Sequence, residues 1–79
     1  MKRLSEITPG VKVIIREVEN DELFLKLMEM GFIPGEMITV DQIAPLGDPI
    51  SVCVAGYSLS LRLNEANSVL VEEVMIKTA

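Results

Sequence analysis

The chain has 79 residues, a formal net charge of −5, one cysteine and no histidine. This length predicts one domain over residues 1–79, and an acidic surface repels phosphate groups, which argues against nucleic acid or an anionic membrane as the main partner. Without histidine, the chain lacks histidine-based acid–base catalysis, histidine metal sites and Cys–His nucleophiles.

The lone cysteine and the apolar runs indicate where the protein resides. Cys53 has no second cysteine with which to form an intrachain disulfide, which favours a reducing compartment. No basic residue adjoins Cys53 to activate its thiol, so we expect it to be structurally neutral. No apolar run is long enough to span a bilayer, and residues 1–6 lack the apolar stretch of a signal peptide. We therefore expect a cytoplasmic protein with no membrane-spanning segment.

The N-terminal part predicts a polar lead-in followed by a strand. Leu4 and Ile7 are apolar within the lead-in, and we expect them to cover one end of a core. Residues 8–10, Thr-Pro-Gly, are typical of a turn. Residues 11–18 alternate apolar and polar side chains, as a half-buried strand does. Ile14 interrupts the polar face, which indicates that part of that face is covered.

Residues 21–30 predict the one full helix of the chain. Its apolar side chains recur at steps of three and four and form one broad stripe: Leu23, Phe24, Leu27, Met28 and Met30. A stripe of this kind usually faces a core, so we expect the first three to be buried. Asp21 is expected to cap the first turn, and Glu22 adds negative charge where the helix dipole favours it.

The end of this helix is specified by Gly31, because glycine readily takes the left-handed position that follows a helix. With Gly31 there, Phe32 and Leu27 occupy the two apolar positions of a Schellman ending. Pro34-Gly35 then predicts a turn, since proline fixes φ and glycine accepts positive φ. A helix that ends so firmly is expected to fix the angle between the strands that flank it.

The link before the helix is acidic and raises the question of a cation site. Its four acids are Glu17, Glu19, Asp21 and Glu22. A hard cation needs several oxygens in a fixed cage, usually with a glycine turn between them. The link has no such spacing, so we interpret it as a solvated acidic face and predict no metal site.

A rigid loop follows the second predicted strand, which covers residues 36–44. Residues 44–49, Ala-Pro-Leu-Gly-Asp-Pro, place two prolines around a Gly-Asp pair and leave the loop little freedom. Asp48 precedes a proline, which restricts it to an extended conformation. Leu46 gives the loop an apolar point, which can either tuck under the loop or face a partner.

The rest of the chain predicts a hairpin, a helical turn and a last strand. Residues 50–55 and 57–63 alternate cleanly, and Ala55-Gly56 between them is typical of a tight hairpin turn. Residues 64–67 predict a single helical turn, and residues 68–74 predict the last strand.

The number and order of these elements predict a mainly β fold. Five short strands are expected, with one helix between the first and second strands and an apolar tail at Val74-Met75-Ile76. Strands of this number and spacing can curl into a small closed barrel, which removes exposed edges.

Three stretches carry a more specific pattern. They are residues 27–35 (Leu-Met-Glu-Met-Gly-Phe-Ile-Pro-Gly), residues 44–50 (Ala-Pro-Leu-Gly-Asp-Pro-Ile), and residues 59–62 (Leu-Ser-Leu-Arg) with Glu65-Ala66. They closely resemble the FeoA family, small cytoplasmic proteins of bacterial and archaeal ferrous iron transport. The resemblance implies an SH3-like barrel with an inserted helix and an accessory role beside FeoB, a GTPase-linked membrane iron permease. The same module is fused to some metal-dependent repressors, which leaves a regulatory role open.

The resemblance implies a non-enzymatic module that binds the cytoplasmic side of FeoB and alters its assembly or its GTPase cycle. A small barrel has a packed core rather than a ligand cavity, so we expect no cofactor and place the contacts on the surface. The expected contact residues lie at the helix exit and in the proline-rich loop: Met28, Met30, Phe32, Pro34, Pro45 and Leu46. Met28 and Phe32 can instead belong to the core. The residues expected to hold these segments in shape are Gly31, Gly35, Gly47, Asp48 and Pro49.

Other functions are weaker interpretations of the same residues. Asp and Glu side chains with Cys53 can hold Fe²⁺, but without histidine the site would be poor and exposed. Small barrels often bind RNA, although the acidic balance and a lone Tyr57 argue against a base-stacking platform. An enzyme is not expected, because no titratable pair forms a recognisable catalytic motif. The sequence leaves self-association open.

Overall fold

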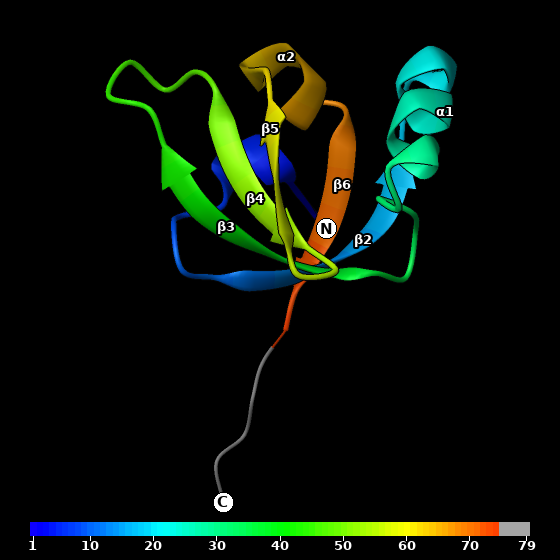
Figure 1. The fold of residues 1–79 in the computed structure, drawn as a ribbon, viewed down its shortest axis with the longest axis horizontal. Helices are drawn as coiled ribbons and strands as arrows, with labels where there is room; N and C mark the ends of the chain where they lie inside the picture. Colours follow the sequence, from blue (N-terminus) through cyan, green and yellow to red (C-terminus); the bar gives the residue numbers. More distant parts are fainter. Residues whose placement is uncertain (75–79) are drawn as a thin grey trace, which may run out of the picture.

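The computed structural model describes residues 1–74, which form one antiparallel sheet with helices at one end (Figure 1). In chain order the elements are β1 (Lys2–Arg3), the 3-10 helix η1 (Leu4–Glu6), β2 (Lys12–Val18), α1 (Asp21–Glu29), β3 (Met37–Ile43), β4 (Ile50–Val54), β5 (Tyr57–Leu61), α2 (Leu63–Ala66) and β6 (Val69–Glu73). The prediction of a mainly β fold with a helix between the first two long strands is confirmed.

The sheet has the strand order β1-β6-β2-β3-β4-β5, and every neighbouring pair is antiparallel. The five predicted strands correspond to β2 through β6, with ends that differ by one or two residues. Strand β1 was not predicted, because two residues are too few to show an alternating pattern.

The sheet is strongly curved, but it does not close into the expected barrel. Strand β5 pairs only with β4 and β1 only with β6, so the hydrogen-bond ladder stops at both edges. After β5 the chain turns into α2, which leads across to β6 (Figure 1). The register shifts in β2 between Ile15 and Glu17, and in β3 between Val40 and Gln42. Such bulges bend strands, so the sheet wraps around the core while two edges stay open.

The core is wholly apolar, since none of the buried residues described is polar or charged. Leu4 and Ile7 are among the buried residues, so the prediction that they cover one end of the core is confirmed. Ile14 is half-buried, as its place on the polar face of the strand indicated. Burial of these apolar side chains is the main favourable term that holds so small a fold together.

Helix α1 is capped by Asn20, which corrects the expectation that Asp21 would cap it. Asn20 has extended backbone angles, φ −110° and ψ 120°, and its Oδ1 accepts a hydrogen bond from the Leu23 N–H at 3.0 Å. Asp21 lies one residue too far along the chain to make this bond and is the first helical residue instead. Its charge still stabilises the helix through the dipole.

The β4–β5 hairpin has the predicted two-residue turn. Ala55 and Gly56 both have positive φ, +50° and +86°, which is the geometry of a type I′ turn and confirms the prediction. Helix α2 starts one residue before the predicted helical turn. Of the predicted apolar tail, Val74 is half-buried, whereas Met75 and Ile76 lie outside the described residues. Within residues 1–74, no helix is both long and apolar enough to cross a membrane.

Candidate partner-binding surface

The helix exit, residues 28–35, has the predicted Schellman ending. The Phe32 N–H donates to the Leu27 carbonyl at 2.9 Å, and the Gly31 N–H donates to the Met28 carbonyl at 3.0 Å. Gly31 has φ +82°, the left-handed conformation that this motif requires. These bonds satisfy carbonyls that the end of a helix leaves without partners. The direction of the chain after α1 is therefore set locally.

Phe32 is buried with no exposed surface, so the expectation that it contacts a partner is wrong. The Schellman ending directs its ring onto Leu27, which is also fully buried. Met28 is 44% exposed and Pro34 is exposed, whereas Met30 is half-buried against the core. The exposed apolar residues of the helix exit are therefore Met28, Ile33 and Pro34, and Ile33 was not among the expected contact residues.

Two further contacts hold the helix exit in place. The Gly35 N–H donates to the Ile15 carbonyl of β2 at 2.8 Å, and Gly35 has φ +96°. Tyr57 of β5 lies close to Gly31: a Cβ added to Gly31 would be 3.3 Å from the Tyr57 hydroxyl. Tyr57 is 43% exposed and thus adds an exposed aromatic side chain near Gly31. The sequence pattern alone did not connect Tyr57 with this end of the helix.

The proline loop, residues 44–49, is closed by its own backbone. The Gly47 N–H donates to the Ala44 carbonyl at 2.7 Å, and the Ala44 N–H donates to the Pro49 carbonyl at 3.1 Å. Pro45 is exposed, and Leu46 is 95% exposed. The Leu46 side chain therefore points outward and is not tucked under the loop. An apolar side chain that is held so far into solvent by a tight turn is suited to a contact with another molecule.

Asp48 joins the proline loop to α2. Its Oδ1 accepts a hydrogen bond from the N–H of Leu63 at 3.0 Å, and Leu63 is the first residue of α2. The first N–H groups of a helix have no partner within the helix, so this carboxylate satisfies one of them. The Asp48–Pro49 peptide bond is cis. The hydrogen bond from Leu63 to Asp48 connects the loop to the start of α2.

The helix exit and the proline loop do not form one surface. In Figure 1 the proline loop extends at the upper left, and the chain leaves α1 at the lower right. The contact residues expected from the sequence thus fall into two groups, Met28 with Pro34 and Pro45 with Leu46. A single small pocket of a partner cannot contain both groups.

Between the two groups lies a surface that the sequence did not predict. An open groove of about 340 Å³, here called the inter-helix groove, separates α1 from α2 and is lined by Asn20, Glu22, Leu23, Lys26, Asn64, Glu65 and Ser68. A second depression of about 430 Å³, here called the β5 cleft, is lined by Lys26, Asp48, Pro49, Ser60, Arg62 and Glu65. Lys26 and Glu65 line both and separate one from the other.

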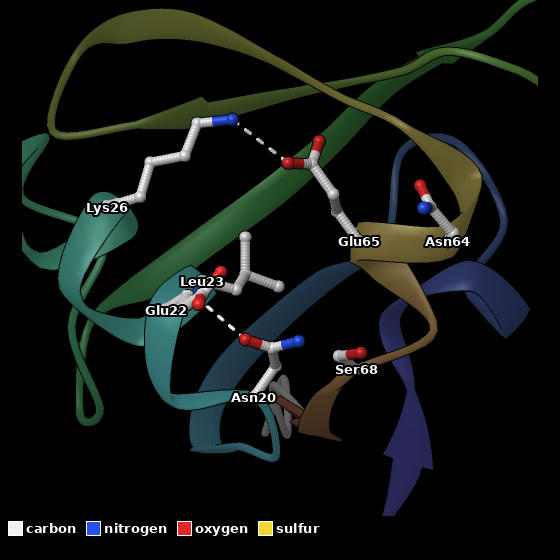
Figure 2. Close-up of a pocket in the computed structure, with 7 residues that line it drawn as sticks. All are labelled: Asn20, Glu22, Leu23, Lys26, Asn64, Glu65 and Ser68. Carbon is white, nitrogen blue, oxygen red and sulfur yellow. Dashed lines mark hydrogen bonds and ion pairs between the residues drawn. The ribbon is translucent and has the colours of Figure 1, made fainter.

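An ion pair marks this boundary. The Lys26 Nζ lies 3.0 Å from the Glu65 Oε2, so that the pair connects α1 to α2 (Figure 2). The Glu65 Oε1 accepts a second bond, from the Arg62 N–H at 2.9 Å. The bond from the Arg62 backbone, and then the bond from Lys26, lower the pKa of the Glu65 carboxyl below its ordinary value. Glu65 therefore keeps its charge further into the acid range than a free glutamate.

The residues considered for metal binding do not come together. Among residues 1–74, no group of three or more Cys, Asp and Glu side chains is placed to hold a metal ion. In the acidic link, Glu19 forms an ion pair with Arg3, and Glu17, Asp21 and Glu22 are exposed. Cys53 is half-buried in β4, between Thr39 of β3 and Ser58 of β5.

The inter-helix groove and the β5 cleft were missed because Lys26 and Glu65 are 39 residues apart in the chain. Helical periodicity can place Lys26 on the exposed face of α1, but it cannot say what faces it. A local signal did exist at two positions. Asn20 before two acids is typical of a helix start, and the spacing of Arg62 and Glu65 is typical of a side chain that bonds back to the first turn.

Comparison with known proteins identifies the family. The FeoA domain family matches residues 2–73. The chain is 44% identical over 71 residues to a Fe(2+) transport protein A/Fe(2+) transporter FeoB fusion protein of Porphyromonas gingivalis, covering 89% of this chain and 8% of the fusion protein. The chain thus spans less than a tenth of that relative.

Two solved structures share the fold. The iron(II) transport protein A of Clostridium thermocellum is 44% identical, with a TM-score of 0.86, over 92% of this chain and 46% of that one. The FeoA of Stenotrophomonas maltophilia, complexed with zinc and described as a prokaryotic SH3 domain protein, is 30% identical, with a TM-score of 0.78, over 91% of both chains. The expected SH3-like fold is confirmed, and the chain belongs to the FeoA domain family.

Proposed function

We propose that this protein is a non-enzymatic binding module that acts in ferrous iron transport by docking on the cytoplasmic side of an FeoB-type transporter. The observation that carries the proposal is the Porphyromonas gingivalis fusion, in which a segment 44% identical to this chain is covalently joined to the transporter. Domains that are joined in one polypeptide commonly work together. The S. maltophilia relative is itself proposed as a ferrous iron transport activating factor.

The distribution of side chains supports binding at the surface rather than chemistry in an interior site. The described core contains only apolar residues, and catalysis needs polar groups that are held out of bulk water. Some of the large apolar side chains that are exposed in residues 1–74 lie on segments whose shape is fixed by backbone hydrogen bonds. Leu46 at the tip of the proline loop and Met28 at the helix exit are two of them. Preorganised apolar points of this kind lose little entropy when they bind a partner.

The contact residues that follow from this proposal form two sites. The first comprises Met28 and Pro34, with the exposed part of Met30, and the second comprises Pro45 and Leu46. Because these sites lie at different ends of the molecule, a transporter that contacts both must offer an extended surface. Contact with only one site would leave the other free for a second copy of the module.

The direct test is a binding measurement with the cytoplasmic region of the cognate FeoB, followed by transporter GTPase rate and iron uptake with and without this protein. We expect saturable binding and a change in GTPase rate that disappears when binding is blocked. Absence of binding by a chain whose fold is verified by NMR would contradict the proposal. Anaerobic calorimetry with Fe²⁺ is the control, since tight one-to-one uptake of the ion would indicate a metal sensor instead.

A further inference from the structure

The two edges of the sheet differ in how they are protected. Strand β1 is only two residues long and carries Lys2 and Arg3, which form ion pairs with Glu73 and Glu19. Short edge strands with charged side chains resist pairing with other chains. Strand β5 has five residues, Tyr-Ser-Leu-Ser-Leu, with no charge, no proline and no register shift against β4. The length, sequence and register of β5 therefore give its edge none of the protections that β1 has.

The turn geometry shows which backbone groups point away from the sheet. Val54 and Tyr57 flank a two-residue turn, and such a pair exchanges both of its hydrogen bonds across the hairpin. Hydrogen-bonded pairs alternate with non-bonded ones along the ladder, so Leu59 bonds inward like Tyr57. The N–H and C=O groups of Ser58 and Ser60 then point outward. Within residues 1–74, no backbone bond outside the strand ladder involves them.

The side chains around this edge indicate the chemistry of a binding partner. Ser60 and Arg62 both line the β5 cleft, which gives access to this end of the edge. Arg62 takes part in none of the ion pairs formed within residues 1–74, whereas Lys26 in the same cleft is paired with Glu65. Asp48 and Glu65 line the same cleft, and the charge of Arg62 acts on Glu65 without forming an ion pair with it. The Arg62 guanidinium can therefore still bind a further carboxylate, with which it can form two parallel hydrogen bonds. On the inner face, the partly exposed Tyr57 and Leu59 offer apolar contacts.

We propose that the β5 edge accepts an extended segment of the transporter's cytoplasmic region as an additional strand. The segment bonds to the outward backbone groups of Ser58 and Ser60, packs alternate apolar side chains against Tyr57 and Leu59, and places an acidic side chain at Arg62. Added strands gain affinity from backbone bonds and specificity from alternate side chains. This assignment rests on the proposed function, because it names the contact by which the module binds its transporter.

Amide hydrogen exchange, read residue by residue by NMR, tests the assignment on the unmodified protein. In the free chain the Ser58 and Ser60 amides should exchange fast, whereas the Tyr57 and Leu59 amides should be protected by β4. On addition of the FeoB cytoplasmic region, the two serine amides should become protected by at least about tenfold, while the two inward amides serve as internal controls. Serine amides that stay unprotected in a saturated complex would overturn the assignment.

Proline variants give a second readout that does not depend on exchange. Ser58→Pro and Ser60→Pro remove only outward N–H groups, and proline is tolerated at such edge positions. Each should weaken binding by about tenfold or more, whereas the matched Ser58→Ala and Ser60→Ala variants keep the N–H and should bind within about twofold of the wild type. Arg62→Glu should weaken binding by a similar factor, and Arg62→Lys by less, since lysine keeps the charge.

The outcomes separate this assignment from the proposed function. If the wild type and both proline variants bind the FeoB region equally well, the β5 assignment falls and the proposed function stands. If the folded wild type does not bind, both fall. If the serine amides become protected in the chain alone, with a concentration-dependent increase in mass by light scattering, the occupant is a second copy and the assignment to the transporter is overturned.

Discussion

The helix exit and the proline loop both combine glycine, proline and an apolar residue, but one buries its apolar residue and the other exposes it. Each has an apolar residue next to a glycine with positive φ, Phe32 after Gly31 and Leu46 before Gly47. Phe32 has no exposed surface, whereas Leu46 is 95% exposed. At the helix exit the Schellman bonds direct the chain back onto the core, while the proline loop closes on its own backbone and directs its tip outward. The hydrogen bonds of the turn, and not its composition, decide which apolar residue is available to a partner.

Phe32→Ala should have the largest effect on stability. Truncation of a fully buried phenylalanine removes its packing and leaves a cavity, which should lower the free energy of unfolding by about 3–5 kcal/mol. Urea denaturation measures this loss directly. A loss below about 1 kcal/mol would mean that the helix exit is as open as the proline loop, and the comparison between them would fail.

Gly31→Val should destabilise the fold by a smaller amount, about 1–3 kcal/mol, because a β-branched residue is strained at φ +82°. Its Cβ would also lie 3.3 Å from the Tyr57 hydroxyl. Gly31→Asn is the matched control, since asparagine adopts the left-handed conformation more readily, and it should lose less stability. Equal denaturation midpoints for the wild type and Gly31→Val would contradict the role of Gly31 in ending α1.

Leu46→Asp should separate binding from stability in the proline loop. The side chain is exposed, so the free energy of unfolding should change by no more than about 0.5 kcal/mol. Binding to the FeoB cytoplasmic region should weaken by about 1–2 kcal/mol, because a charge replaces an apolar contact. Leu46→Met keeps an apolar side chain and should bind nearly as well as the wild type. A folded Leu46→Asp protein with wild-type affinity would remove the proline loop from the contact surface.

Glu65→Gln should have the smallest effect, and one that depends on pH. The pKa of Glu65 is lowered in the folded state, so its carboxylate stabilises the fold above its unfolded pKa, and this contribution is lost as the pH falls through its folded pKa. The variant should be less stable than the wild type by no more than about 1 kcal/mol at neutral pH. The difference should therefore shrink as the pH is lowered through the acid range below the ordinary glutamate pKa of about 4.3.

The matched control for this prediction is Glu22→Gln. Glu22 lines the same inter-helix groove but belongs to none of the ion pairs described in residues 1–74. Its replacement removes a carboxylate from the groove without breaking the ion pair between Lys26 and Glu65, so in urea denaturation at neutral pH it should lower the free energy of unfolding by less than Glu65→Gln does. If both variants lower the free energy of unfolding equally, the ion pair between Lys26 and Glu65 makes no contribution of its own to the stability of the fold.

What the sequence predicted well is what depends on neighbouring residues. The end of α1 followed from Gly31 and Phe32, and the β4–β5 turn followed from Ala55-Gly56, because a few backbone angles decide both. The capping residue of α1 was misplaced by one position because Asn20 and Asp21 are both good caps, and only the backbone angles at Asn20 show which one is used.

What the sequence could not predict depends on contacts between distant segments. Alternation finds the strands but not whether the first and last of them meet, so the open sheet was not foreseen. The ion pair between Lys26 and Glu65, which separates the inter-helix groove from the β5 cleft, joins residues that lie on different elements. Phe32 was assigned to the surface because its sequence position suits a partner contact and a core position equally well.

The pairing of β1 with β6 brings the two ends of the domain together, since Lys2 lies opposite Val71. Both ends belong to the sheet edge opposite β5. A polypeptide attached at either end would therefore continue from β1 or β6 and would leave the hydrogen-bond ladder of β5 unchanged. Such a tether holds a module at an effective concentration on the order of millimolar, so even a weak contact becomes mostly occupied. A detached module needs a stronger contact, or a high abundance in the cell, to reach the same occupancy.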